Sequence, residues 1–396
     1  MEDIVGVSNK FNTPNAKPDK RFNKKKMEEV RYFHKSLPFY EPTPLESLDN
    51  LANHLGLKKL YVKNEGKRFN LNAFKGLGVC YAVAKHYADA LGLDMRNTTF
   101  TELKEKAEKL APITFTTATD GNHGKSLAWS AKLFGQQARV YMPKVSRKAR
   151  LDAILAMGAK AKITDMNYDD TVEMVAKKAE ENGWVLVQDT SFGEYFGVPI
   201  HIMQGYTSIV TEIQEQLGDT NLTDITHVFL QAGVGSFPAA IAATIHNITG
   251  DKRPIFAILE PNRADCFYQS AKEGKGETKR VHGDLDTMMA GLACGEPNPI
   301  AWEILNPITD SYYSCEEDVS GTGMRVLGNP IDPDTRIISG ESGSLPLGFV
   351  YELMRDDKYE EYRKQLKLDE NSQVLVINTE GDTDPANYRK VVWDNN

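Results

Sequence analysis

Strand-like and helix-like stretches alternate along much of the chain, and this alternation constrains the fold more than any other feature. Between residues 114 and 188, β-prone runs at 114–118, 138–143, 161–164 and 184–188 are separated by helical patterns. Parallel strands need long crossover connections, which are usually helices, so this alternation is typical of a parallel sheet covered by helices. A second series begins near His201 and ends with a buried-strand pattern at 374–377. The sequence therefore predicts an α/β chain with two open, twisted, mostly parallel sheets and helices on both faces.

The remaining segments give weaker signals. We expect residues 1–35 to form a polar arm with one helix over 25–35, and residues 201–217 to form a single helix. Another helix is expected from a capping Ser146 to Gly158, because serine caps helix starts and glycine ends helices. Residues 274–343 are rich in Gly, Pro and Asp, and we expect irregular loops there.

Composition places the chain among soluble globular proteins. It has 396 residues, enough for two or three domain-sized units, with 41% hydrophobic and 26% charged residues. Lys and Arg number 47 against 55 Asp and Glu, giving a net charge of -8, which disfavours nucleic acid and anionic membranes as partners. No apolar run is long enough to span a bilayer, and the polar N-terminus lacks a signal-peptide core. We therefore expect a cytoplasmic protein with no membrane partner.

The cysteines do not indicate a metal site. Cys80, Cys266, Cys294 and Cys315 include no Cys-x-x-Cys pair, so a zinc cluster is disfavoured and no metal is expected. Reduced thiols are the default for a cytosolic protein. Cys266 and Cys294 bracket one connected segment and could meet, so their pairing stays open.

Lys75 lies at the start of a predicted helix. It follows a strand-like run at 59–63 and a polar turn at 64–66, and it precedes an apolar helical run. Backbone N–H groups and the helix dipole create a positive field at a helix start, which favours the neutral form of a lysine amine. The neutral amine is the form that builds a Schiff base with a carbonyl group. From position alone, a solvated lysine on the first turn remains the commoner explanation.

A glycine turn at 233–236 follows one strand-like run and opens a helix. Without Cβ atoms at Gly233 and Gly235, the backbone can wrap an anion, and the helix start supplies N–H donors. The full dinucleotide-binding fingerprint is absent, because Pro238 stands where a third glycine is needed. Taken alone, a structural strand–helix turn explains this segment about as well as a phosphate site.

Three further polar positions follow strand-like runs. Asp120 lies in the segment 119–124, Asp189 follows the run at 184–188, and Thr379 follows the run at 374–377. Open α/β sheets bind ligands at the carboxyl ends of their strands. Each residue also has a structural explanation: an Asx-turn for Asp120, a helix cap for Asp189 and a turn for Thr379. His123, which lies in the same segment as Asp120, is expected to be a structural loop residue.

Four motifs, in one order along the chain, resemble those of the tryptophan-synthase-β-like (fold type II) pyridoxal-phosphate enzymes. They are Asn72-Ala73-Phe74-Lys75, Thr119-Asp120-Gly121-Asn122-His123-Gly124, Gln231-Ala232-Gly233-Val234-Gly235-Ser236 and Thr379-Glu380-Gly381-Asp382. The resemblance covers nearly the whole chain from about Tyr40 onward. Within this family, the motifs are most similar to those of the diaminopropionate ammonia-lyases.

The resemblance implies pyridoxal 5'-phosphate as the cofactor and a small amino acid as the substrate. Lys75 would carry the cofactor, Thr379 would face its ring nitrogen and Asn122 would lie beside its phenolic oxygen. The phosphate would be held by Gly233, Val234, Gly235 and Ser236. The substrate carboxylate would be held by Thr119, Asp120, Gly121 and Asn122.

The implied reaction is the α,β-elimination of D- or L-2,3-diaminopropionate to pyruvate and two ammonia molecules. Most relatives have a small uncharged residue at position 120, and a second ammonium group on the substrate would offset the charge of Asp120. Asp120 and Asp189, with Lys75, are the expected catalytic residues, each carboxylate removing the α-proton of one enantiomer. The alternatives are a serine/threonine dehydratase, a β-replacing synthase, a cofactor-binding protein without turnover and, more weakly, a nicotinamide enzyme.

The resemblance also implies the domain organisation. Residues 1–84 and 201–396 would form a discontinuous large domain that carries Lys75 and the phosphate loop. Residues 85–200 would form a small domain that carries Asp120 and Asp189. The active site would lie in the cleft between the two domains, and the enzyme is expected to be a homodimer.

Overall fold

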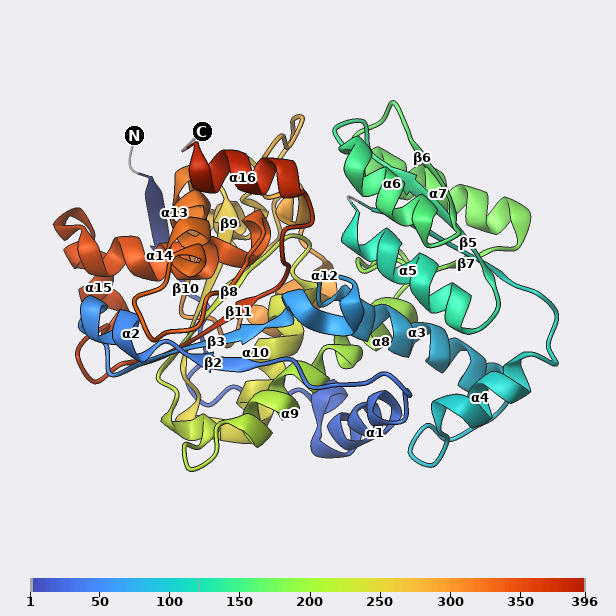
Figure 1. Cartoon of the computed structure of the whole chain (residues 1–396), viewed down its shortest axis with the longest axis horizontal. Coiled ribbons are helices and arrows are strands. Elements are labelled where there is room, and N and C mark those ends of the chain that lie inside the picture. Colours follow the sequence, from blue (N-terminus) through green and yellow to red (C-terminus); the bar gives the residue numbers. More distant parts are fainter. Residues whose placement is uncertain (1–2, 120, 395–396) are drawn as a thin grey trace.

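The computed structural model describes residues 3–119 and 121–394, and its strands form two sheets (Figure 1). The seven-stranded sheet has the order β1-β10-β9-β8-β11-β3-β2, and the four-stranded sheet has the order β6-β5-β4-β7. The strands are β1 Ile4–Ser8, β2 Leu45–Ser47, β3 Lys59–Asn64, β4 Thr114–Ala118, β5 Gln137–Met142, β6 Lys160–Ile163, β7 Val185–Leu186, β8 His227–Gln231, β9 Ile255–Pro261, β10 Ser311–Cys315 and β11 Gln373–Asn378. Only the two edge pairs, β1–β10 and β2–β3, are antiparallel in the described sheets. The predicted α/β fold with two mostly parallel sheets is confirmed.

Helices cover both sheets (Figure 1). They are α1 Lys24–Lys35, α2 Asp49–Leu55, α3 Lys75–Ala90, α4 Phe100–Ala107, α5 Asn122–Leu133, α6 Lys148–Ala156, α7 Tyr168–Asn182, α8 Gly197–Gly205, α9 Thr207–Gln216, α10 Ser236–Thr249, α11 Cys266–Glu273, α12 Pro299–Leu305, α13 Glu317–Gly328, α14 Glu341–Arg355, α15 Glu360–Leu366 and α16 Pro385–Trp393. The helix α3 contacts both α8 and α5, so it connects the half that holds the larger sheet with the half that holds the smaller one.

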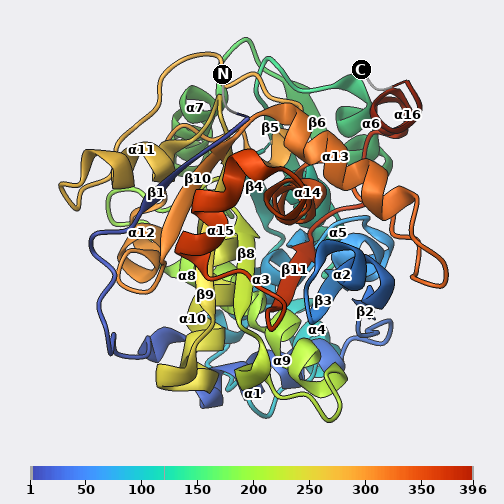
Figure 2. The same cartoon turned by 90° about the vertical axis from the view of Figure 1, so that its left-hand side faces the viewer.

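Two apolar clusters fill opposite faces of the larger sheet. The strand β11 shows why, because its side chains alternate between the faces. Leu375 and Ile377 pack with residues of α3 and α10, whereas Val374 and Val376 pack with residues of α14. Figure 2 shows α14 and α10 on the two sides of these strands. An apolar strand that is buried on both faces is typical of a parallel sheet.

The N-terminal segment differs from the expected polar arm. Residues 4–8 form β1, which pairs with β10 at the edge of the larger sheet, and the side chain of Ile4 is fully buried. The predicted helix over 25–35 is present as α1. The predicted single helix over 201–217 is two helices, α8 and α9, which meet at Tyr206. Ser146 does not cap α6, whose N-cap is Arg147 with no side-chain hydrogen bond.

The prediction of irregular loops over 274–343 was wrong for part of that segment. It contains α12, β10 and α13. One of its glycines, Gly323, serves close helix packing instead, because a Cβ there would lie 2.2 Å from the Ser344 carbonyl oxygen. Across the same contact, a Cβ on Gly348 of α14 would lie 1.8 Å from the Val319 carbonyl oxygen. Only glycine allows the backbones of α13 and α14 to approach so closely.

Two kinds of feature are absent from the described part of the chain. Within residues 3–119 and 121–394, no helix has the length and apolar character needed to cross a membrane. The same residues contain no group of His, Cys, Asp and Glu side chains that could hold a metal ion. All four cysteines are buried, and no disulfide joins Cys266 and Cys294.

Candidate active site

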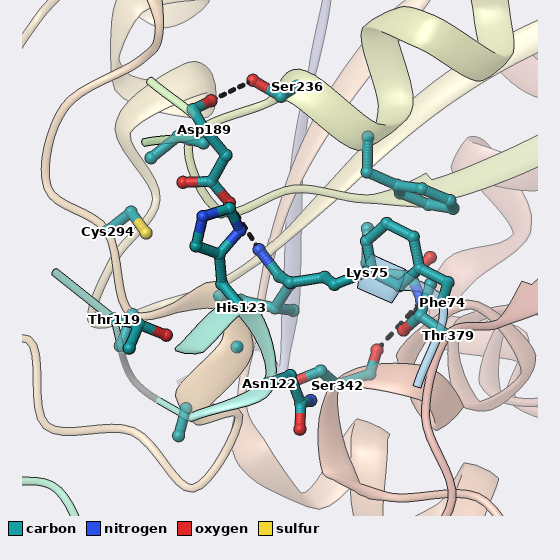
Figure 3. A pocket seen from close by; sticks show the side chains of 18 of the residues that line it. Phe74, Lys75, Thr119, Asn122, His123, Asp189, Ser236, Cys294, Ser342 and Thr379 are labelled. Carbon is teal, nitrogen blue, oxygen red and sulfur yellow. Dashed lines mark hydrogen bonds and ion pairs between the residues drawn. The ribbon is translucent and has the colours of Figure 1, made fainter. Parts of the chain in front are cut away.

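One cavity brings together residues from both halves of the molecule (Figure 3). Nine of the residues singled out in the sequence line it: Lys75, Thr119, Asn122, Asp189, Gly233, Val234, Gly235, Ser236 and Thr379. Gly121 does not line this cavity, but its backbone N–H donates to Thr119 Oγ1 at 3.0 Å. Asp120 lies outside the described residues.

Lys75 is presented by a turn with an unusual backbone. Phe69, Asn70 and Asn72 all have positive φ angles, of 51°, 56° and 63°, which cost energy for residues with a side chain. Hydrogen bonds to the segment after β11 hold this turn, because Phe74 N donates to Thr379 O and Gly381 N donates to Asn72 O. The loop after β11 therefore fixes where α3 begins and where Lys75 enters the cavity.

Lys75 Nζ lies 2.6 Å from Asp189 Oδ2, so the two side chains form an ion pair inside the cavity (Figure 3). Burial alone would raise the pKa of Asp189, but Lys75 and then His123 outweigh it and lower that pKa to about 2. The field at the helix start favours a neutral lysine. The charge of Asp189 acts in the opposite direction and stabilises the ammonium form.

Asp189 is not a helix cap. It is 4% exposed, and the next helix, α8, begins only at Gly197 without a side-chain cap. His123 supports it from α5: His123 Nε2 lies 2.8 Å from the Val187 carbonyl, which can only accept, so the hydrogen is on Nε2. His123 Nδ1 then faces Asp189 Oδ2 at 3.6 Å. The expectation that His123 is only a loop residue missed this contact, because nothing in the local sequence indicates which strand lies opposite.

The turn at 233–236 requires glycine at Gly235 and leaves little room for a side chain at Gly233. Gly235 has a φ of +91°, and a Cβ there would lie 2.2 Å from the Phe267 ring; a Cβ on Gly233 would lie 3.0 Å from the Gly291 carbonyl oxygen. The Ser236 hydroxyl is already used, since it donates to the Asp189 carbonyl at 2.5 Å and accepts from Asn298 Nδ2 at 2.8 Å. Backbone N–H groups at the start of α10 are therefore the donors that remain for an anion.

Three polar side-chain atoms on the cavity wall lack hydrogen-bond partners among the described residues. They are Tyr206 OH, Gln231 Oε1 and Ser342 Oγ. Each of these residues is at most 3% exposed, and buried polar atoms without partners are uncommon in folded proteins. The segments around Tyr206 and Ser342 carry no recognisable motif, so the sequence does not indicate these two residues. Gln231 lies within a motif that indicates no role for its side chain.

Glu380 is a further residue that the sequence did not indicate as functional. Its buried carboxylate accepts a hydrogen bond from Asn122 Nδ2 at 2.5 Å and from the backbone N–H of Ser342 at 3.1 Å. Asn122 begins α5 in the half with the smaller sheet, and Glu380 follows β11 of the larger sheet. The two halves are therefore joined directly at the wall of the cavity.

A family model described as "Pyridoxal-phosphate dependent enzyme" matches residues 37–380. The chain belongs to this family. A diaminopropionate ammonia-lyase of Escherichia coli (strain K12) is 45% identical over 389 residues, which cover 98% of this chain and 96% of the relative. The diaminopropionate ammonia-lyase of Salmonella typhimurium (strain LT2) is 45% identical over 368 residues, covering 92% and 91%.

Solved structures agree with this assignment. The crystal structure of the holo diaminopropionate ammonia lyase from Escherichia coli matches with a TM-score of 0.92 and 42% identity, covering 99% of this chain and 97% of that one. The structure of the same enzyme with an aminoacrylate-PLP azomethine reaction intermediate matches with a TM-score of 0.91. The resemblance drawn from the four motifs, the fold type and the pyridoxal 5'-phosphate cofactor are thus confirmed.

The cavity of this family member has features that suit its cofactor. The amine of Lys75 lies inside it, and glycines leave room where a Cβ would clash. Several buried polar atoms in its wall have no hydrogen-bond partner among the described residues. Lys75 would hold the aldehyde, the turn at 233–236 would hold the phosphate, and Thr379 would face the ring nitrogen.

Proposed function

We propose that this chain is a pyridoxal-phosphate-dependent carbon–nitrogen lyase that converts 2,3-diaminopropionate to pyruvate and two ammonia molecules by α,β-elimination. The observation that carries the proposal is the whole-length relationship to diaminopropionate ammonia-lyases at 45% identity. The Lys75–Asp189 pair in the cavity supports it, because elimination needs an amine for the cofactor and a base for the α-proton.

The cofactor, when bound, withdraws electrons from the α-carbon of the substrate. The chain supplies the proton-handling groups. Asp189 is a carboxylate at neutral pH, because Lys75 outweighs the effect of burial and lowers its pKa to about 2. A group with so low a pKa is a weak base, and it becomes a stronger one once Lys75 no longer carries its charge. Lys75 Nζ lies 2.6 Å away and can hold a proton at the same place. We propose Asp120 as the second base, with Thr119, Asp120, Gly121 and Asn122 holding the substrate carboxylate.

The leaving group sets a further requirement. A β-amine leaves well only when it is protonated, so an acid must lie near it. Part of the cavity wall is aromatic, since Phe74, Tyr206 and Phe237 line it and pack against one another. Their apolar surfaces limit the access of water, which strengthens the electrostatic contacts inside.

We also propose the domain boundaries and the assembly. The large domain would comprise residues 1–84 and 201–396, and the small domain residues 85–200. The distribution of strands supports this division, since β4 to β7 of the smaller sheet all lie between residues 114 and 186. A homodimer in the cytoplasm is the expected state, and light scattering of the purified protein checks the subunit number.

Pyruvate release from D- and L-2,3-diaminopropionate, measured beside D- and L-serine, tests the proposed activity. We expect faster turnover of diaminopropionate than of serine. Release from serine alone would indicate a serine dehydratase instead. Yellow protein that borohydride bleaches, but that releases no pyruvate from any of the four, would indicate a binding protein.

Asp120→Ala tests the choice of substrate. We expect this variant to lose far more activity on diaminopropionate than on serine, because only diaminopropionate carries a second ammonium group for the carboxylate to attract. The difference between the two losses is the test, because loss of a general base, which typically costs about 10²- to 10⁴-fold, would affect both substrates. Equal losses on both substrates would remove the reason for preferring diaminopropionate.

A further inference from the structure

The side chain of Gln231 lies at the cavity wall, where β8 ends. It is 2% exposed. Its Nε2 atom lies 2.9 Å from Thr379 Oγ1, 3.1 Å from the Ser342 carbonyl oxygen and 3.1 Å from the Ile377 carbonyl oxygen. One amide nitrogen is thus surrounded by three oxygen atoms.

These neighbours determine which way the amide faces. The carbonyl oxygens of Ser342 and Ile377 can only accept hydrogen bonds. The amide atom that points at them must therefore be the NH₂ group, because the opposite orientation would place oxygen against oxygen. The contact pattern fixes the orientation of the Gln231 amide.

The orientation of Gln231 in turn fixes the role of Thr379. An amide nitrogen carries two hydrogens and does not accept, so one N–H group is shared between two of the three oxygens. In the 2.9 Å contact the Thr379 oxygen can therefore only be an acceptor. The hydroxyl hydrogen of Thr379 then has to point elsewhere. Among the described residues, no group accepts a hydrogen bond from Thr379 Oγ1, and this residue lines the cavity. The hydroxyl is therefore left as a donor toward the cavity.

We propose that Gln231 is a positioning residue that keeps Thr379 a hydrogen-bond donor, so that the ring nitrogen facing Thr379 is held unprotonated. The inference rests on the proposed placement of the cofactor ring against Thr379. It adds a requirement on the neighbouring side chain: a carboxylate or an apolar group at position 231 would leave Thr379 able to turn its hydrogen away. The nitrogen could then carry a proton and donate it to the hydroxyl oxygen.

Nitrogen NMR of the holoenzyme, reconstituted with pyridoxal 5'-phosphate labelled with ¹⁵N in the ring, tests this proposal. In the wild-type protein we expect the ¹⁵N shift of an unprotonated, hydrogen-bonded pyridine between pH 6 and 9. In Gln231→Met we expect the shift to move toward the protonated form, and the dissociation constant of the cofactor to rise about 2- to 10-fold, as for the loss of one hydrogen bond.

Gln204→Met is the matched control. Gln204 is also buried, and its Nε2 also donates to a backbone carbonyl, that of Arg21 at 3.0 Å, but it does not line the cavity. The same substitution there should leave the ¹⁵N shift unchanged. Thr379→Val should remove the hydrogen bond and Thr379→Ser should retain it, which checks that the shift reports on the hydroxyl.

Two results would overturn the proposal. One is a protonated ring nitrogen in the wild-type enzyme, which needs no variant and so does not depend on whether Gln231→Met folds. The other is a folded Gln231→Met protein with the wild-type ¹⁵N shift. Both are distinguishable from a failure of the proposed function, because pyruvate release from diaminopropionate is measured separately.

Discussion

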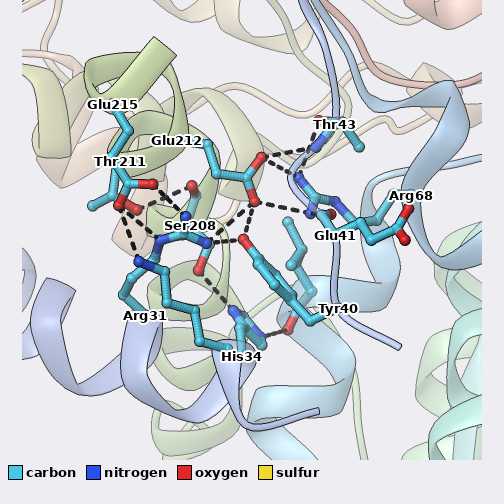
Figure 4. A network of polar contacts seen from close by, with 12 residues as sticks. Arg31, His34, Tyr40, Glu41, Thr43, Arg68, Ser208, Thr211, Glu212 and Glu215 are labelled. Atoms are coloured by element: carbon cyan, nitrogen blue, oxygen red, sulfur yellow. Dashed lines mark hydrogen bonds and ion pairs between the residues drawn. The ribbon is translucent and has the colours of Figure 1, made fainter. Parts of the chain in front are cut away.

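Two buried polar regions flank the turn that presents Lys75, and they differ in how fully their hydrogen bonds are satisfied. The first, here called the Glu212 network, joins α1, the segment before β2, the segment 63–68 and α9 (Figure 4). It consists of Arg31, His34, Tyr40, Thr43, Lys63, Glu65, Arg68, Ser208, Glu212 and Glu215. The second region is the cavity around Lys75 (Figure 3).

In the Glu212 network the central carboxylate is well satisfied. Glu212 is fully buried and accepts from Lys63 Nζ at 2.6 Å and from both terminal nitrogens of Arg68, at 2.9 and 2.7 Å. In the cavity, by contrast, Tyr206, Gln231 and Ser342 each have a buried polar atom with no partner among the described residues. A buried network whose polar atoms are all hydrogen-bonded stabilises the fold. Buried polar atoms without hydrogen bonds, by contrast, mark where a ligand can supply the missing partners.

The largest expected effect is on stability, from a change at the centre of the Glu212 network. Burial alone would raise the pKa of Glu212, but Arg68 and then Lys63 lower it. Glu212→Gln removes the charge that these two buried cations need, and breaking a buried ion pair on one side typically costs about 3–5 kcal/mol. We expect a loss of this size in urea unfolding at pH 7.

Glu215→Gln is the control for this prediction. Glu215 lies three residues further along, pairs with Arg31 and is 49% exposed, so its ion pair should contribute no more than about 1 kcal/mol. Equal losses in the two variants would mean that burial of the Glu212 network does not matter. The comparison between the two polar regions would then lose its basis.

A smaller effect on the free energy of unfolding should come from His34 and should depend on pH. His34 is fully buried: Nε2 contacts the Leu77 carbonyl at 3.1 Å and Nδ1 contacts Ser208 Oγ at 2.7 Å. Burial, and then the charge of Arg68, lower the pKa of His34 from 6.5 to about 3. Below pH 6.5 the unfolded chain binds a proton that the folded chain does not, so stability falls as the pH falls from about 6.5 toward 3.

His34→Gln tests this sign. A glutamine can still donate to a carbonyl but does not titrate. Between pH 7 and pH 5, we expect the unfolding free energy of the wild type to drop by about 2 kcal/mol more than that of the variant. Urea unfolding at the two pH values measures both drops. The same drop in the two proteins would contradict the assignment of His34 as a neutral member of the network.

The contrast between these regions also shows what the sequence could predict. Lys75 at a helix start, Gly235 in a strand–helix turn and Asp189 after a strand all depend on residues within a few positions, and the structure places all three in the cavity. The hydrogen-bond partners of a side chain cannot be predicted from such local patterns. Asn122 and Glu380 are 258 residues apart, and Gln231 and Thr379 are 148 apart. Local patterns define strands and turns, but only the sheet order decides which side chains meet.

The same reasoning explains the segment 274–343. Its glycines are compatible with loops and with tightly packed helices, and the choice depends on α14, which follows later in the chain. Glycine is required both at Gly348 of α14 and at Gly323 of α13, because a Cβ at either position would clash with the backbone of the other helix. A single sequence gives no signal for such mutual packing, so loops were the natural expectation.

The smallest effect that we predict is at Ser342, and its direction is opposite to that of Glu212→Gln. The backbone of Ser342 is used on both sides, since its N–H donates to Glu380 Oε1 and its carbonyl accepts from Gln231. Of the polar atoms of Ser342, only Oγ lacks a partner among the described residues. Ser342→Ala therefore removes one unsatisfied buried atom and leaves the backbone contacts in place.

In the protein stripped of cofactor, we expect Ser342→Ala to be neutral or up to about 1 kcal/mol more stable than the wild type, because it no longer buries an unpaired hydroxyl. Cofactor binding should change the other way, with a dissociation constant that rises about 2- to 10-fold if the hydroxyl meets the ligand. Urea unfolding and cofactor titration measure the two quantities. A clear loss of stability without cofactor would mean that the hydroxyl already has a partner, and the cavity would then resemble the Glu212 network rather than contrast with it.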